Sequence, residues 1–138
     1  MKPGTLRPVG LFTVDEAHAE LTRLLPRLNE IVRLRAEHAE LAAAVKAGST
    51  SALGGLPELK GATARLDDLL TEVQQTGVEL KGIAPLLLDF PADLDGVPVL
   101  LCWLEGDRAI GWYHRADLGF AGRRRLPVRD DAPSQLPW

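Results

Sequence analysis

The chain has 138 residues, of which 46% are hydrophobic and 25% charged, and its formal net charge is −3. This is the composition of a globular protein that is long enough to bury a core as a single domain. Because the charge balance is slightly negative, we expect no nucleic acid and no membrane surface as a partner. The single cysteine excludes an intrachain disulfide bond and a zinc site built from several cysteines.

The amino-terminal residues 1–12 contain several prolines and glycines and are predicted to form an arm. They lack the apolar centre of a signal peptide, and no apolar run in the chain approaches the roughly 20 residues of a membrane span. We therefore expect a cytoplasmic protein.

A first helix is predicted over residues 13–47. Thr13 and Glu16 have the spacing of a capping box, in which each side chain binds the backbone N–H of the other residue. Apolar residues then recur every three or four positions, as they do in coiled coils. This stripe comprises Val14, Ala17, Leu21, Leu24, Leu28 and Ile31.

A second helix is predicted over residues 57–76, after a loop rich in Gly and Ser, and Gly77 is placed to end it. Its apolar stripe comprises Leu59, Ala62, Leu66, Leu69 and Val73. The two helices form an antiparallel hairpin over residues 13–76. Because two helices alone cannot enclose an apolar stripe, the C-terminal region, a second copy or both must cover it, and we expect a homodimer through the hairpin.

From residue 77 the apolar pattern changes to alternation, which is typical of strands. Strands are predicted at 78–83, 86–90, 98–105 and 108–114, with a loop at 91–96. The fold class is therefore α+β: a long helical hairpin followed by a small, mainly antiparallel sheet over residues 77–127. Residues 128–138 are predicted to be a loosely held tail.

The last two strands form the clearest β-hairpin, with Gly106-Asp107 as a two-residue type II′ turn. That turn predicts a register in which Trp103 and Trp112 share one face with His114, while Gly111 lies opposite Cys102. Both faces are then largely apolar, so we expect the sheet to be covered on both sides.

Five residues in and near this hairpin are candidates for ligand binding. His114 ends a strand and is the candidate general acid or base. Asp89, Asp107 and Asp117 are the carboxylates closest to it in the chain or by strand pairing. One histidine with two carboxylates is a weak metal signal without a spaced His/Cys pair, so we assign no metal and no cofactor. Cys102 is interpreted as core packing.

The segment GFAGRRR supplies the fifth candidate, Arg123. Arginine beside a glycine-rich loop suits a carboxylate or phosphate group. The alternative is a solvated turn in which Arg123 pairs with Asp89 or Asp117. Three arginines are too few to indicate sequence-specific binding of nucleic acid.

Several short motifs of the chain resemble a known family. They are DFPA (89–92), LCW (101–103), Gly106 with an acid after it, His114 and GFAGR (119–123), together with FTVDEA and GVELKGI earlier in the chain. In this order they resemble an uncharacterised bacterial family, domain-of-unknown-function family 2203, over about residues 11–127. The family usually has Glu at Asp107 and Trp at Tyr113. The resemblance implies a helical hairpin with a small sheet and no particular activity.

Two functional hypotheses follow from the sequence. The first is a non-catalytic module that forms oligomers through the hairpin and binds a protein partner or a small anionic ligand. It accounts for the heptad stripes and for the absence of a paired nucleophile and base. The second is a small enzyme in which His114 exchanges protons, a nearby carboxylate assists it and Arg123 anchors an anion. The first is preferred.

Overall fold

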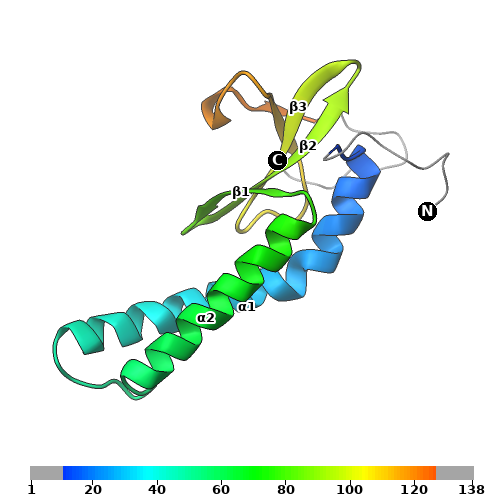
Figure 1. Ribbon diagram of the computed structural model, residues 1–138. Helices are drawn as coiled ribbons and strands as arrows, with labels where there is room; N and C mark the ends of the chain where they lie inside the picture. Colours follow the sequence, from blue (N-terminus) through cyan, green and yellow to red (C-terminus); the bar gives the residue numbers. More distant parts are fainter. Residues whose placement is uncertain (1–10, 127–138) are drawn as a thin grey trace. The chain divides into compact units, whose positions relative to one another are not determined.

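The computed structural model describes residues 11–126 and has the predicted α+β fold (Figure 1). Two helices precede a five-stranded sheet. The elements are α1 (Val14–Lys46), α2 (Leu56–Gln75), β1 (Glu79–Ile83), β2 (Leu86–Leu94), β3 (Val97–Leu104), β4 (Trp112–Arg115), the 3₁₀ helix η2 (Phe120–Gly122) and β5 (Arg124–Arg125). The predicted tail 128–138 and nearly all of the predicted arm 1–12 lie outside the described residues.

The chain divides into two compact units. One is the helical hairpin, Arg23–Gln75, and the other joins the sheet to the beginning of α1. The predicted organisation of a single domain into an arm, a hairpin, a sheet region and a tail stays a prediction. Among residues 11–126, no helix combines the length and apolar character that crossing a bilayer requires.

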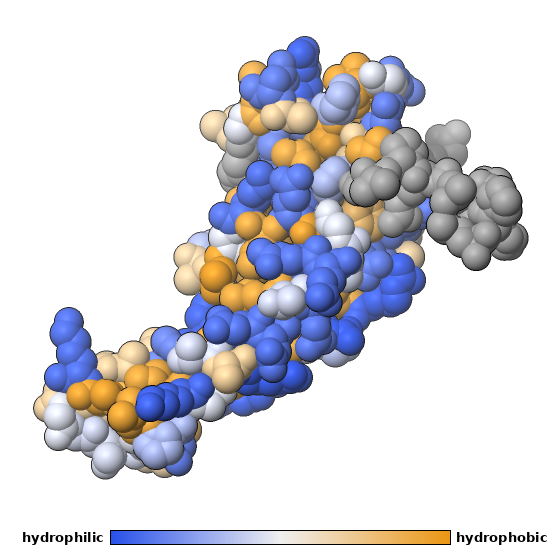
Figure 2. All heavy atoms as spheres, in the orientation of Figure 1, coloured by the Kyte–Doolittle hydropathy of each residue, from blue (hydrophilic) through white to orange (hydrophobic). Residues whose placement is uncertain are grey.

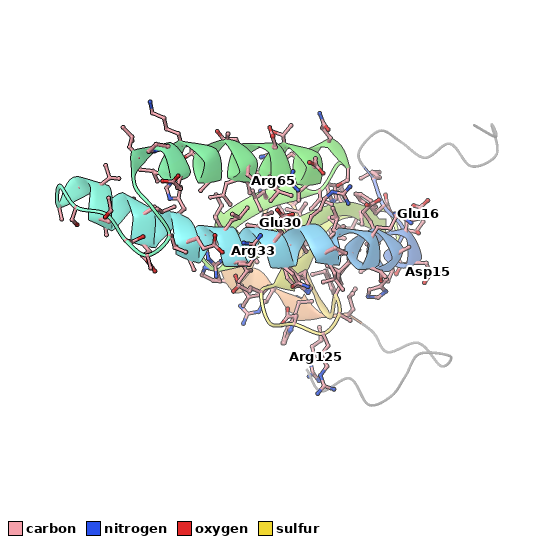
Figure 3. All side chains as sticks on the ribbon, turned by 90° about the horizontal axis from the view of Figure 1, so that it is seen from below. Asp15, Glu16, Glu30, Arg33, Arg65 and Arg125 are labelled. Atoms are coloured by element: carbon pink, nitrogen blue, oxygen red, sulfur yellow. The ribbon has the colours of Figure 1, made fainter. Side chains whose placement is uncertain are left out.

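Both helices begin and end where their sequences predict. At the start of α1, the Thr13 N–H donates to Glu16 Oε1 at 2.9 Å and the Glu16 N–H donates to Thr13 Oγ1 at 3.0 Å, which confirms the capping box. Asp15 and Glu16 lie together at this end of the helix (Figure 3). α2 ends just before Gly77, whose φ of 95° favours glycine.

The helical hairpin combines an apolar stripe with ion pairs that join its two helices. Leu28 and Ile31 of α1 and Leu69 of α2 are fully buried. Outside this core, Arg65 of α2 donates two hydrogen bonds to Glu30 of α1, both 2.9 Å long, and the two side chains point toward each other in Figure 3. The stripe therefore drives the helices together, while the ion pairs lie at its exposed border.

The sheet is antiparallel throughout, in the order β1-β2-β3-β4-β5. The prediction that residues 91–96 form a loop is wrong, because β2 continues to Leu94. The turn is only Asp95-Gly96, with φ values of 54° and 83°. Two positive φ values in succession are those of a type I′ turn, which matches the twist of paired strands and lets β2 extend.

The predicted register between β3 and β4 is also wrong. Leu100 pairs with His114, and Cys102 pairs with Trp112 instead of Gly111. The connection is longer than two residues because Asp107 closes a turn on the end of β3. Its N–H donates to the Leu104 carbonyl at 2.8 Å, and its carboxylate accepts the Leu104 N–H at 3.0 Å.

The residues after this turn pack against α1 before β4 begins. His18 Nε2 lies 3.1 Å from the Ile110 carbonyl oxygen, and Ile110 is buried. β4 begins at Trp112. Because successive strand residues point to opposite faces, the one-residue difference turns every side chain of β4 to the other face.

The corrected register defines two faces of the sheet. The histidine face carries Asp89, Cys102, Trp112 and His114, and the pocket face carries Phe90, Val99, Leu101, Tyr113 and Arg115. Trp103 and Trp112 therefore lie on opposite faces, contrary to the prediction. Every residue of β3 from Val99 to Trp103 is buried, in agreement with a sheet that is covered on both sides.

Candidate functional site

Three polar side chains meet in the interior of the histidine face. Asp89 of β2 lies directly opposite Cys102 of β3, and His114 follows on β4. One ligand-type atom from each residue lies within 4.8 Å of the other two. All three residues are at most 4% exposed. This buried triad consists of residue types that bind metal ions or take part in proton transfer.

The hydrogen bonds of His114 determine how its ring is oriented. Nδ1 lies 2.9 Å from the Arg115 carbonyl oxygen, and Nε2 lies 3.4 Å from Asp89 Oδ2. A carbonyl oxygen only accepts hydrogen bonds, so Nδ1 carries a hydrogen and donates it. In a neutral imidazole Nε2 then presents its lone pair to the Asp89 carboxylate.

Asp89 and Cys102 are less well satisfied than His114. Asp89 Oδ1 is fully buried and has no hydrogen-bond partner within the described part of the chain. The Cys102 thiol donates a weak hydrogen bond to the Leu100 carbonyl oxygen, with Sγ 3.7 Å away, and it also interacts with the Asp89 side chain. Burial raises the pKa of the Cys102 thiol far above its usual value, and the charge of Asp89 and a hydrogen bond to it add to this effect. The triad thus places a carboxylate oxygen without a hydrogen-bond partner beside a thiol and an imidazole, where water is excluded.

The remaining predicted site residues lie elsewhere. The Asp107 carboxylate closes the turn after β3. The backbone carbonyl oxygen of Asp107 accepts a hydrogen bond from the indole N–H of Trp103 at 3.0 Å. Asp117 forms two hydrogen bonds with Arg115, of 3.0 and 2.9 Å, and both side chains are exposed. Of the five candidates, the structure therefore brings only Asp89 and His114 together.

Arg123 lies against an aromatic ring. Its guanidinium carbon is 5.1 Å from the centre of the Trp112 ring, and that of Arg125 is 5.6 Å from it. Arg125 extends from the sheet in Figure 3. Cationic groups at this distance from a ring face are attracted by its quadrupole. Arg123 and Arg125 therefore share the surroundings of Trp112, while Arg124 between them belongs to the other face.

A pocket of about 360 Å³ opens on the pocket face. The residues that line it are Leu94, Asp95, Val97, Val99, Tyr113, Arg115, Leu118, Gly122 and Arg124. The glycine-rich loop before β5 thus contributes to a pocket, but Arg124 lines it rather than Arg123. Neither Asp89 nor His114 takes part in this pocket.

Sequence reasoning missed Cys102, Arg115 and Arg124. Cys102 was separated from His114 by the wrong register, although LCW and His114 belong to the same motif series. Arg124 could have been found from the sequence, because successive residues of a strand point to opposite faces of the sheet. Arg124 therefore lies on the face opposite to that of Arg123 and Arg125. Arg115 carried no signal of its own beyond its place next to His114.

Comparison with known proteins identifies the family of the chain. The family model described as "Uncharacterized conserved protein (DUF2203)" matches residues 10–126, which include the triad and the pocket. No curated protein and no solved structure matches significantly. The motifs that suggested this resemblance are therefore confirmed, and the chain belongs to the DUF2203 family.

Proposed function

We propose that this protein is a non-catalytic module that binds a small anionic ligand in the pocket and forms a homodimer through its helical hairpin. The observation that carries the ligand proposal is that Arg115 and Arg124 line the same pocket as four aliphatic side chains. A guanidinium group offers several N–H donors in a planar fork that fits carboxylate and phosphate oxygens.

The composition of the pocket favours a weakly charged ligand with an apolar part. Leu94, Val97 and Val99 offer an apolar wall for such a group. Part of the positive charge is offset by Asp95, which also lines the pocket, and by Asp117, which is bound to Arg115. A ligand with several negative charges would be repelled by these carboxylates, so an apolar monocarboxylate fits best.

Calorimetric titration with benzoate tests this proposal, with benzyl alcohol as the uncharged analogue. We expect benzoate to bind and benzyl alcohol to bind more weakly. Arg124→Gln should weaken benzoate binding by about tenfold or more, because a hydrogen bond to a charged group contributes about 1.5–3 kcal/mol.

Arg123→Gln is the matched control, since it removes the same charge from the neighbouring position on the other face. It should leave the affinity nearly unchanged. An equal loss for both variants would indicate a general charge effect, and the absence of any carboxylate binding would contradict the proposal.

The homodimer proposal is supported by apolar residues at the end of the hairpin. Leu53 and Leu56 are 40% and 49% exposed where α1 connects to α2. Hydrophobic atoms lie at the surface at this end of the hairpin in Figure 2. Large exposed apolar side chains that lie close together often mark contacts between proteins.

Sedimentation velocity across micromolar concentrations tests the homodimer. We expect a dimer that Leu56→Glu dissociates. Ile83→Glu, which changes a similarly exposed residue of the sheet, should leave the dimer intact. A wild-type monomer throughout the range would refute the homodimer.

The enzyme hypothesis is favoured by one observation, the 3.4 Å distance between His114 and Asp89. Two other features weigh against it. Both ring nitrogens of His114 already face oxygen atoms, and neither residue lines the pocket. An acid or base must reach the substrate atom whose proton it exchanges. We therefore prefer the non-catalytic role.

A further inference from the structure

The proposed anion pocket makes no use of the buried triad of Asp89, Cys102 and His114. Polar groups in a protein interior are nearly always paired, because an unpaired one loses its hydrogen bonds to water without replacement. The unpartnered Oδ1 of Asp89 departs from this rule at the point where a thiol and an imidazole also converge. The triad therefore needs an explanation of its own.

The geometry of His114 and Asp89 sharpens the question. Because Nδ1 donates its hydrogen to the Arg115 carbonyl, a neutral ring turns the Nε2 lone pair toward Asp89 Oδ2, 3.4 Å away. A lone pair and a carboxylate oxygen repel each other unless a positive centre lies between them. That centre is either a proton or a metal ion.

We propose that Asp89, Cys102 and His114 are the protein ligands of one Zn²⁺ ion, bound in the interior of the histidine face. Carboxylate oxygen, thiolate sulfur and imidazole nitrogen are the three ligand types of zinc proteins. The fourth position of the tetrahedron would be taken by a water molecule or a small anion. Cys102 binds as the thiolate, and its proton passes to the solvent.

The distances fit this ion after small side-chain rotations. Zinc–ligand bonds of about 2.0–2.3 Å place the ligand atoms of a tetrahedron roughly 3.3–3.8 Å apart. The triad atoms lie within 4.8 Å of one another on three adjacent strands, so the backbone already holds them in a cluster. The charge of the neighbouring Lys81 is compensated by Glu79, whose carboxylate is 3.0 Å from its ammonium group.

The surroundings of His114 also match those of a metal ligand. A histidine that binds zinc through one ring nitrogen usually donates the hydrogen of the other to a carbonyl or carboxylate oxygen. The 2.9 Å hydrogen bond from Nδ1 to the Arg115 carbonyl is of this kind. An ion between Nε2, Sγ and the Asp89 carboxylate would also satisfy Oδ1.

Titration of the chelator-treated full chain with Co²⁺ tests the proposal, because Co²⁺ replaces Zn²⁺ and is coloured. We expect one bound ion per chain, a thiolate-to-cobalt charge-transfer band and intense tetrahedral d–d bands. The chain has one cysteine, so the charge-transfer band reports on Cys102 directly and without any variant. Zn²⁺ added afterwards should displace the cobalt and abolish both sets of bands.

Variants then assign the other two ligands. Asp89→Asn and His114→Gln should each weaken Co²⁺ binding by about tenfold or more, and Cys102→Ser should abolish the charge-transfer band. His38→Gln and Asp117→Asn, which change a histidine and a carboxylate outside the triad, should bind as the wild type does. Circular dichroism of each variant separates lost binding from lost folding.

Two results would overturn the proposal. One is a wild-type chain that binds neither Co²⁺ nor Zn²⁺, in which case a proton is the positive centre between His114 and Asp89. The other is Co²⁺ bound without a charge-transfer band, which would place the ion away from Cys102. Neither result affects benzoate binding, because the pocket lies on the other face of the sheet.

Discussion

The two faces of strands β3 and β4 differ in how far their polar side chains are exposed to solvent. On the histidine face, Asp89, Cys102 and His114 are polar and at most 4% exposed. On the pocket face, Phe90 and Leu101 are fully buried, but Arg115 and Arg124 at the border of the same sheet remain exposed around a pocket. The histidine face thus buries the three polar groups of the triad, whereas the pocket face keeps Arg115 and Arg124 in water.

The contrast shows that two kinds of site differ in how deeply their polar groups are buried. Exposed arginines keep their hydration and can exchange it for a ligand at little cost. Buried acceptors have already lost their water, so they gain most from a permanently held positive centre. We therefore expect an exchangeable ligand on the pocket face and a resident ion on the histidine face.

The largest effect on this comparison should come from His114→Ala. In metal-free protein the variant leaves the Asp89 carboxylate buried without its nearest partner, and we expect the free energy of unfolding to fall by about 3–5 kcal/mol. Urea denaturation measures it. His18→Ala, which removes one part-buried hydrogen bond to the Ile110 carbonyl, is the control and should cost about 1 kcal/mol. Similar losses of unfolding free energy for both variants would mean that His114 stabilises the fold no more than a histidine with one ordinary hydrogen bond.

The second effect concerns access to Cys102, which is 2% exposed. Alkylation of a buried thiol requires local opening, so the native chain should react on the order of a hundredfold more slowly than the denatured chain. Mass spectrometry follows the reaction over time. The control carries Ala121→Cys in a Cys102→Ala background and should react fast in both states, because Ala121 is exposed. Rapid alkylation of Cys102 in the native chain would show that the histidine face does not exclude solvent from the triad.

The third effect tests the turn that precedes β4. Asp107→Ala removes the carboxylate that accepts the Leu104 N–H, and hydrogen bonds to charged groups contribute about 1.5–3 kcal/mol. We expect a loss of this size in urea denaturation. Asp117→Ala breaks an exposed pair with Arg115 and should cost no more than about 1 kcal/mol. If the two variants are equally stable, Asp107 does not hold the register.

The smallest effect lies in the helical hairpin. The hydrogen bond from Arg65 holds the pKa of Glu30 below its ordinary value of 4.5. A carboxyl whose pKa is lowered by folding stabilises the protein above its ordinary pKa, and this contribution disappears as the pH falls through the lowered value. Thermal unfolding between neutral pH and pH 3 should therefore show a slightly weaker acid dependence for Glu30→Gln than for the wild type.

Because both side chains of this pair are exposed to solvent, the difference should be small. Glu40→Gln, on an exposed position of the same helix, is the control and should follow the wild-type curve. An acid dependence of Glu30→Gln identical to that of the wild type would mean that the ion pair does not stabilise the hairpin.

The helical hairpin could be read from the sequence because its signals are local. The capping box at Thr13, the spacing of apolar residues and Gly77 each act within one or two helical turns. The α+β class followed from the change of period after Gly77. The strands of the sheet were harder to predict from the sequence. Pro91 and Asp93 are residue types typical of loops, but β2 pairs with β3 through both of them and ends only before Asp95-Gly96.

The candidate site could be predicted only in part. Asp89 and His114 were named, because a buried strand that ends in Asp and a strand that ends in His are visible as patterns. Cys102 was not, since its proximity to His114 depends on a register that differs by one residue from the predicted one. Arg123 was chosen for the anion site, but β5 turns Arg124 to the pocket instead.

The helices, the order of the first four strands and the region in which a site had to lie were thus accessible from the sequence, whereas β5 was not predicted. The predicted features depend on composition, on periodicity and on residues that are close together in the chain. Which side chains share a face became known only from the folded chain. That choice depends on contacts such as Asp107 with Leu104 and His18 with Ile110, and in a strand a shift of one residue is enough to exchange the two faces.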